Sequence, residues 1–212
     1  GIITFDDILD VIEEENTEDM ERMGGVIDNT DKDYLDTPVL MHVKARLPWL
    51  LVLMVSYVFT GGMIASFEKS LSAVIALVAY MPMLMGTGGN SGTQSSTVII
   101  TGMATGDLEL SDVLRVLWKE FRIGIIVGIC VSILNYMRIV AFDHNGSLVA
   151  LTVCLSMVLI VIIAKCIGAL LPMIAKKIGI DPALIAGPMM ASLTDMVALG
   201  TYFTMARLVL KI

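Results

Sequence analysis

DPALIAGPMMASLTDMVALGTYFTMARLVL, residues Asp181–Leu210, is the stretch of sequence that decides the fold. From Pro182 onward it is apolar over more than the roughly 20 residues that a helix needs to cross a bilayer. Asp195 is the one acidic residue inside this apolar run. A carboxylate at that depth costs a few kcal/mol on insertion scales, so it faces a water-filled path or a positively charged partner rather than lipid.

The whole chain has the composition of a membrane protein. Of its 212 residues, 56% are hydrophobic, and its mean hydropathy of +0.83 is too high for an ordinary soluble domain. We predict an all-α membrane protein with five transmembrane helices per chain, preceded by a short connecting helix. The five spans lie near Leu47–Phe67, Leu71–Met103, Val116–Phe142, Ser147–Ile174 and Pro182–Leu210.

The net charge of −7 is divided unevenly along the chain. Residues 1–36 carry a net charge of −11, whereas residues 37–212 carry +4. The acidic segment argues against a nucleic acid as a partner. We therefore expect an acidic soluble segment joined to a mildly basic membrane region.

Basic residues near the ends of the spans predict the orientation in the cell membrane. With the N-terminus in the cytoplasm, seven of them are cytoplasmic and four are outside, and cytoplasmic loops carry the excess of Lys and Arg. Five spans then place the C-terminus outside. The seven are Lys44, Arg46, Arg115, Lys119, Arg122, Lys176 and Lys177, and the four are Lys69, Arg138, Arg207 and Lys211.

Residues 1–27 are predicted to be the end of a cytosolic domain. Gly1–Thr4 has the pattern of a short strand, and a helix follows over Phe5–Glu15, with Thr4 as its N-cap and Asp7 in the capping-box position. The alternative is a disordered acidic tail. Because the chain begins with Gly1 rather than Met, we expect this segment to belong to a larger domain.

Residues 28–46 are predicted to be a linker followed by the connecting helix. The linker is the polar run Asp28–Asp36, and Pro38 suits the first turn of a helix over Thr37–Arg46. Arg46 and Trp49 fit an anchor at the membrane interface. Residues 47–212 then form the transmembrane domain.

The second predicted span is unusually polar. Pro82 is followed by GTGGNSGTQSST over Gly86–Thr97, and this composition predicts a bend or break. Non-helical backbone at that depth survives only where it is buried in protein or lines water. Asn90 and Gln94 would share one helix face, and Gly88 and Gly89 would allow close approach of another backbone.

Two interpretations of this polar span remain open. Small residues alone would fit a helix-packing seam, which is common in membranes. The two amides on one face favour a polar path instead. By contrast, the pair Gly124 and Gly128 in the third span is interpreted as packing only.

Pro188 interrupts the last predicted span seven residues before Asp195 and frees the carbonyl of Leu184. Ala191 and Asp195 then share a helix face with Gly187. The result is a groove of small residues with one carboxylate, which suits a hydrated cation.

Lys165 lies within the fourth predicted span. The simplest expectation is that its side chain extends toward the cytoplasmic interface, where Lys176 and Lys177 lie. The alternative is an ion pair with Asp195, which would neutralise the carboxylate.

The oxygen-rich side chains within the spans favour a hard cation such as Mg²⁺ over zinc or copper. Mg²⁺ gives up its waters reluctantly, so one or two carboxylates can hold it through them. One Asp195 per chain supplies a charge of −1, whereas the ion carries +2. A two-fold dimer with the pore on its axis would bring two carboxylates together and balance the charge of the ion.

Four motifs carry a resemblance to a known family. They are PMLMGTGGNSGTQSS (Pro82–Ser96), DPALIAGPMMASLTDMVALGTYF (Asp181–Phe203), RLPWL (Arg46–Leu50) and GIITFDDILDVIEEENTEDM (Gly1–Met20). The chain resembles the membrane domain of MgtE-type magnesium channels and, more distantly, the related eukaryotic solute carriers. The resemblance implies a homodimer with five spans per chain and one pore, lined by the second and fifth spans. It also implies that residues 1–27 end a CBS domain and that the connecting helix is a plug that closes the pore.

The resemblance also implies roles for single residues. Asp195 is the pore acid that holds hydrated Mg²⁺, and the Ala191 carbonyl assists it. The family often has Asn where Gly187 stands, so an amide contact to the ion is missing. The remaining residues at the ion site or along the pore are Gly187, Asn90, Gly88, Gly89, Gln94, Thr194 and Pro188. The resemblance covers little of the family's cytosolic regulatory region, so it carries over no sensor of intracellular Mg²⁺ to this chain.

Other functional classes are less favoured. A proton-coupled transporter of a small solute would also use broken helices and a titrating Asp195, and it predicts proton flux tied to transport. An intramembrane aspartyl enzyme needs two carboxylates in one site, so we expect no enzymatic activity. No GxxxxGK[ST] motif of an ATPase occurs, so we expect Mg²⁺ to move down its electrochemical gradient.

Overall fold

The computed structural model describes residues 1–26, 34–68, 74–143 and 146–211. Within these ranges the chain is helical, which confirms the all-α prediction, and seven α-helices are formed. They are α1 (Phe5–Met23), α2 (Val39–Ser66), α4 (Met81–Ala104), α5 (Val113–Arg138), α6 (Ser147–Lys177), α7 (Ala183–Ala186) and α8 (Pro188–Leu210). Two 3₁₀-helices, η1 (Ile75–Tyr80) and η2 (Leu110–Asp112), and a π-helical turn, η3 (Ile139–Asp143), complete the elements.

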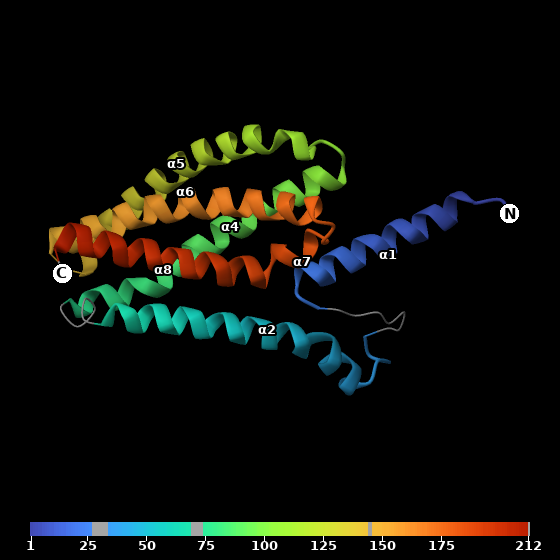
Figure 1. Ribbon diagram of the computed structural model, residues 1–212, viewed down its shortest axis with the longest axis horizontal. Helices are drawn as coiled ribbons and strands as arrows, with labels where there is room; N and C mark the ends of the chain where they lie inside the picture. Colours follow the sequence, from blue (N-terminus) through green and yellow to red (C-terminus); the bar gives the residue numbers. More distant parts are fainter. Residues whose placement is uncertain (27–33, 69–73, 144–145, 212) are drawn as a thin grey trace.

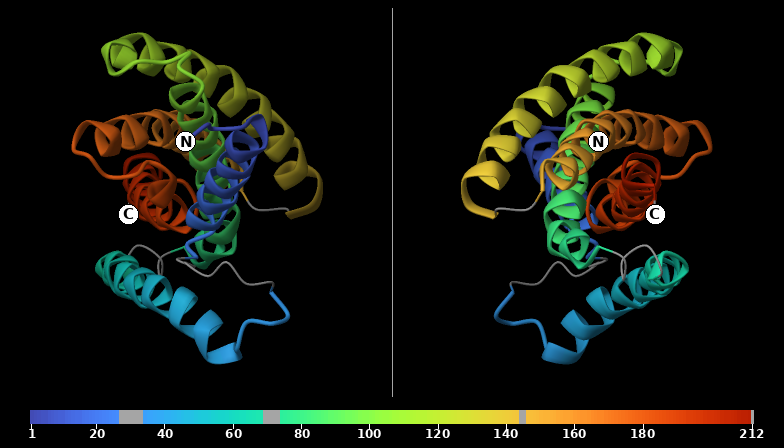
Figure 2. Two further views of the ribbon diagram at one scale, coloured as in Figure 1. Left: turned by 90° about the vertical axis from the view of Figure 1, so that its right-hand side faces the viewer. Right: turned by 90° about the vertical axis from the view of Figure 1, so that its left-hand side faces the viewer.

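The long helices form a bundle with one projecting arm. α4 packs against α6 and α8, α5 packs against α6, and α2 packs against α8. α1 projects from the end of the bundle where α7 lies, and the two chain termini lie at opposite ends of the molecule (Figure 1). Seen end-on, α2 and α5 lie on opposite sides of the bundle (Figure 2).

Four of the helical segments are long and apolar enough to cross a membrane: α2, α5 with its flanking turns, α6 and α8. They match four of the five predicted spans and indicate a multi-pass membrane protein. α4 has 24 residues, about 36 Å of helix at 1.5 Å per residue, and lies among the other helices of the bundle (Figure 1). Because of its polar residues, α4 is not among the helices that are apolar enough to cross a membrane. That this helix is a fifth span therefore stays a prediction.

The N-terminal region differs from the sequence-based expectation. Thr4 caps α1, and the reciprocal bonds with Asp7 confirm the capping box. The helix continues to Met23 rather than ending at Glu15, because no residue in between breaks it. Gly1–Thr4 forms no strand with any described residue. Most of the predicted linker, residues 28–33, lies outside the described residues, as do Lys69 and the start of the second span at Leu71.

The connecting helix is continuous with the first span. α2 runs from Val39 to Ser66 with Pro48 inside it, so the expected boundary near Arg46 is not a break between two helices. Pro48 removes one backbone donor, but helix continues on both sides of it. Pro38 precedes the first residue of α2 as its N-cap.

The predicted break among the glycines of the second span is wrong. α4 is a continuous α-helix through Gly86–Thr97, and Pro82 lies in its first turn, where a proline is well tolerated. The change of backbone occurs earlier, where η1 passes into α4 at Met81. Gly88, Gly89 and Gly92 lie instead in close contacts with neighbouring helices, as described below.

Two apolar clusters stabilise the bundle, one toward each end of α4. The first gathers fully buried side chains such as Leu77, Met157 and Phe203, and the second includes Ile99 and Met173. Fully burying side chains of this size contributes about 1.5–3 kcal/mol each. The small and polar residues of α4 lie between these two clusters in the sequence.

Candidate ion pathway

The helix that carries Asp195 begins where the sequence predicts. α7 ends at Ala186, Gly187 caps both helices, and Pro188 is the first residue of α8. The Ala191 N–H donates to the Gly187 carbonyl at 3.1 Å and so closes the first turn of α8. The proline therefore starts a new helix seven residues before Asp195, which confirms the predicted interruption.

Asp195 is the last partly accessible residue on its face of α8 before that face becomes fully buried. Its side chain is half-buried and forms no hydrogen bond or ion pair with any residue that the structure describes. Leu199, Tyr202 and Ala206 follow on the same face at helical spacing, and all three are fully buried. The Tyr202 hydroxyl donates to the Leu77 carbonyl at 2.9 Å and ties this closed portion to η1.

The glycines of α4 lie in a close contact with α8. A Cβ at Gly89 would stand 3.8 Å from the Cα of Ala191, and one at Gly92 would stand 2.8 Å from Thr194 Cγ2. A Cβ at Gly88 would meet Ile160 of α6 at 3.0 Å. These positions therefore form the packing seam that small residues favour in membrane helices.

Thr194 faces the seam rather than an open surface of the chain. It is buried, and its Oγ1 donates to the carbonyls of Met190 and Ala191, at 2.9 Å each. One lone pair of the Ala191 carbonyl is thereby occupied by a neighbouring hydroxyl. The buried contact between α4 and α8 thus includes Gly88, Gly89 and Thr194. It lies behind the face of α8 that carries Ala191 and Asp195.

The outer face of α4 carries polar side chains from Asn90 to Thr101, interrupted by the exposed Val98. Asn90 and Gln94 are exposed, one helical turn apart, as the sequence predicts. Gly86 and Thr101 are also exposed, and Thr97 is half-buried on the same face. We call Gly86, Asn90, Gln94, Thr97 and Thr101 the polar stripe. A stripe of this kind cannot face lipid without cost, so it lies against water or another protein surface.

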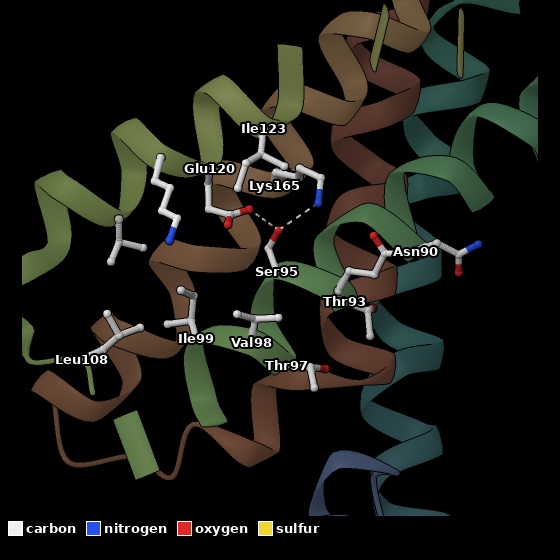
Figure 3. A pocket seen from close by; sticks show the side chains of 13 residues that line it. Asn90, Thr93, Ser95, Thr97, Val98, Ile99, Leu108, Glu120, Ile123 and Lys165 are labelled. Atoms are coloured by element: carbon white, nitrogen blue, oxygen red, sulfur yellow. Dashed lines mark hydrogen bonds between the residues drawn. The ribbon is translucent and has the colours of Figure 1, made fainter. Parts of the chain in front are cut away.

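Lys165 takes neither of the two orientations that the sequence leaves open. Its side chain is buried on α6, and its ammonium donates to Ser95 Oγ of α4 at 3.4 Å rather than reaching the interface. Ser95 Oγ in turn donates to Glu120 Oε2 of α5 at 2.6 Å. Within the described residues no ion pair joins Lys165 to Asp195. Figure 3 shows Ser95 between the two charged groups.

A pocket of about 920 Å³ adjoins this network. Its wall includes Asn90 and Gln94 of the polar stripe together with Ser95, Glu120 and Lys165 (Figure 3). Sequence reasoning missed Glu120. The available signal was an acid inside the predicted third span, next to three basic residues, Arg115, Lys119 and Arg122.

The end of α1 lies against the start of α8. The Met23 carbonyl occupies the space of a Gly187 side chain, since a Cβ there would stand 1.8 Å from this oxygen. Arg22 pairs with Asp181, just before α7, and also with Glu18. Burial raises the pKa of Asp19 in this contact, and the Asp181 carboxylate adds to the effect.

The donor set does not form a site of several ligands in one chain. Among the described residues no three His, Cys, Asp or Glu side chains gather closely enough to hold a metal ion. Asp195 offers one carboxylate, and a single carboxylate can hold only an ion that keeps most of its water shell.

Comparison with known proteins places these features in a family. The pattern of the MgtE family, described as a divalent cation transporter, matches residues 81–205. The chain is 41% identical over 211 residues to the magnesium transporter MgtE of Thermus thermophilus, covering 100% of this chain and 46% of that protein. It is 35% identical over 207 residues to the magnesium transporter MgtE of Bacillus subtilis, covering 97% of this chain and 45% of that protein.

A third relative extends the comparison. The chain is 30% identical over 211 residues to the magnesium transporter MgtE of Enterococcus faecalis, covering 100% of this chain and 46% of that protein. The chain thus spans about half the length of these relatives. It belongs to the MgtE family of divalent cation transporters.

Proposed function

We propose that this chain forms the ion-conducting region of a magnesium transporter, through which Mg²⁺ enters the cell down its electrochemical gradient. The relatives named as magnesium transporters support Mg²⁺ as the transported ion. A membrane potential of 100 mV, negative inside, favours inward movement of a divalent ion by about 4.6 kcal/mol, twice the value for one charge. This function requires no enzymatic activity.

The observation that carries the proposal is the unpaired, half-buried carboxylate of Asp195 in a membrane helix. Such a group needs a positive counter-charge, and Lys165 is engaged with Ser95 instead. A passing cation supplies that charge. Ala191 lies one helical turn before Asp195, and its carbonyl oxygen helps to hold the water shell of the ion once the Thr194 hydroxyl donates to Met190 alone.

The chemistry of the site favours Mg²⁺. Carboxylate, carbonyl and amide oxygens are hard ligands, and Mg²⁺ keeps several of its waters where few protein ligands are offered. The family often has Asn at the position of Gly187, so here the α7–α8 junction contributes backbone only. Pro188 fixes the start of the helix that presents Asp195.

The pore lies between two copies of the chain. Each copy supplies one Asp195, and two carboxylates balance the +2 charge of the ion on a two-fold axis. The polar stripe of α4 faces this water-filled path, with Asn90 and Gln94 among its lining residues. In this arrangement α4 is the fifth span, and Gly88, Gly89 and Thr194 form the packed wall behind the path.

The orientation follows the distribution of basic residues. The N-terminus lies in the cytoplasm and the C-terminus outside, in the plasma or inner membrane. Residues 1–27 end a regulatory domain of CBS type, and the first turns of α2 act as the plug. Cytosolic regulatory domains of the full-length protein are then the partners of this region.

The test is Mg²⁺ uptake into liposomes that contain the purified chain. Asp195→Asn keeps the shape of the side chain and removes its charge, so uptake should fall by about tenfold or more. The matched control is Asp107→Asn, because Asp107 is exposed in the turn after α4. Unchanged uptake in Asp195→Asn would contradict the central role of this carboxylate.

The same liposomes separate the channel from a proton-coupled transporter. A channel carries Mg²⁺ along an imposed potential without any proton gradient. Absence of Mg²⁺ uptake along the potential, together with proton flux that depends on an added small solute, would favour the proton-coupled transporter of a small solute instead. A linked dimer with one Asp195→Asn copy should carry intermediate flux if both carboxylates face one pore.

A further inference from the structure

Two opposite charges are buried together beside the polar stripe of α4. The Lys165 side chain is 5% exposed and the Glu120 side chain is 8% exposed, and these are the two buried charged residues within the described ranges. They come from α6 and α5, and Ser95 of α4 bridges them by hydrogen bonds of 3.4 and 2.6 Å. Three helices are thus joined by one polar network (Figure 3).

Each charge of this pair requires the other. A buried ammonium or carboxylate is strongly unfavourable unless an opposite charge or several hydrogen bonds compensate it. Lys165 has one hydrogen-bond partner among the described residues, the hydroxyl of Ser95. That hydroxyl gives its own proton to Glu120, so the positive charge is balanced through Ser95.

The pair lies close to the proposed ion path. Asn90 and Gln94 line the same pocket of about 920 Å³ as Lys165 and Glu120, and Gln94 directly precedes Ser95 in α4. Charges in a poorly solvated protein interior act over longer distances than charges in water. A change in the net charge of the pair is therefore felt along the polar stripe.

We propose that Lys165 and Glu120 set the electrostatic potential of the ion path and so the Mg²⁺ concentration at which transport saturates. Lys165 opposes the accumulation of cations, and Glu120 cancels that effect. Both act at a distance, through the potential at the polar stripe, and neither binds the ion. This inference rests on the proposed Mg²⁺ transport.

An electrostatic role and a purely structural role predict different effects of removing Lys165 or Glu120. If the network only held α4, α5 and α6 together, losing either charge would impair transport in the same way. If the potential matters, losing Glu120 leaves a net positive charge and losing Lys165 leaves a net negative charge. The two variants should then shift the half-saturating Mg²⁺ concentration in opposite directions.

The experiment measures the initial rate of Mg²⁺ uptake into liposomes against Mg²⁺ concentration. Glu120→Gln should raise the half-saturating concentration by about tenfold, and Lys165→Met should lower it by about the same factor. The double variant should return to within about twofold of wild type, because the pair is neutral again. Shifts in the same direction, or none, would overturn the proposal.

A second pair of variants avoids the buried network. Lys119 lines the same pocket but is exposed, so Lys119→Met removes a positive charge without breaking a buried contact. It should lower the half-saturating concentration by about twofold to threefold, less than Lys165→Met because water screens an exposed charge. Lys177→Met is the control, since Lys177 is exposed at the end of α6 outside the pocket.

The outcomes separate this inference from the proposed function. Absence of Mg²⁺ uptake by the wild-type chain would contradict the proposed function itself. Uptake by wild type with unchanged saturation in Lys119→Met would contradict only the role of the charges around the pocket. Thermal unfolding of each variant in detergent reports its folding separately, so uptake is compared per folded protein.

Discussion

Gly168 of α6 lies directly against the backbone of Gly92 of α4. A Cβ at position 168 would stand 2.2 Å from the Gly92 carbonyl oxygen, and one at position 92 would stand 3.4 Å from the Ala164 carbonyl. The two helices thus approach through backbone atoms, at a level between the apolar clusters. This contact fixes how close α4 lies to α6.

Gly168→Ala should destabilise the bundle. Its methyl group has no space, so α4 and α6 must separate, and the free energy of unfolding should fall by about 1–3 kcal/mol. Gly86→Ala is the matched control, because nothing lies within 4 Å of a Cβ at that position. Alanine there should be neutral or stabilising by about 0.5–1 kcal/mol. Denaturant unfolding in detergent micelles compares the two, and equal effects would contradict the packing argument.

Tyr202→Phe should lower the free energy of unfolding by weakening the contact between the buried part of α8 and η1. The substitution removes the buried hydrogen bond from Tyr202 to the Leu77 carbonyl, which contributes about 1 kcal/mol to the free energy of unfolding. Tyr57→Phe serves as the control because Tyr57 of α2 is half exposed. The same unfolding measurement applies, and a loss confined to Tyr202→Phe is expected.

Gly187→Ala should release the end of α1 from α8. The Met23 carbonyl lies where the new methyl group would be, and backbone at both positions must move. Gly25 packs against the indole of Trp49 in the same region, so Trp49 fluorescence reports the docking once Trp118 is replaced by Phe. An altered emission maximum is expected for Gly187→Ala. Gly62→Ala, with open space around its Cβ, should leave the emission unchanged.

Asp19→Asn should strengthen the docking of α1 at neutral pH. Burial raises the pKa of Asp19, so its charged form is the disfavoured one in the docked state. A carboxyl with a raised pKa opposes docking above that pKa, and the penalty disappears as the pH falls below its ordinary value of about 4. The difference between variant and wild type should therefore be largest at pH 7 and become much smaller toward pH 4.

This pH dependence has a direct measurement and a control. Trp49 emission is followed from pH 7.5 to 4 in the Trp118→Phe background, with and without Asp19→Asn. Asp10→Asn is the control, because Asp10 is exposed in the middle of α1. A constant difference at every pH would show that Asp19 acts through its shape rather than its charge.

The sequence predicts helix starts and close helix contacts correctly where one or two neighbouring residues determine them. Thr4 and Asp7 form the expected cap because a capping box depends on residues only three apart. Pro188 starts α8 because proline cannot continue the preceding helix. Gly124 and Gly128 pack against the Ile162 and Val158 backbone of α6, as their spacing indicates.

Non-local contacts explain the errors. Gly88, Gly89 and Gly92 allow either a bend or a close contact, and only the positions of α6 and α8 decide between them. The sequence favours an interfacial Lys165 because the groups that hold it inside the bundle lie far away in the chain: Ser95 is 70 positions away, and Glu120, which Ser95 links to it, is 45 positions away. Asp195, Asn90 and Gln94 have the expected accessibility, yet their shared role in a path stays a prediction.

The polar stripe of α4 has a consequence for how the chain enters the membrane. α2, α5, α6 and α8 have the length and apolar composition of membrane-crossing helices, whereas a helix with two amides and two hydroxyls on one face gains little from leaving water. If α4 spans the bilayer, its integration depends on neighbouring helices or a second copy that shelter this face. Membrane insertion and tertiary assembly would then be a single coupled event for α4, and variants that loosen its packing would lower the yield of correctly inserted protein.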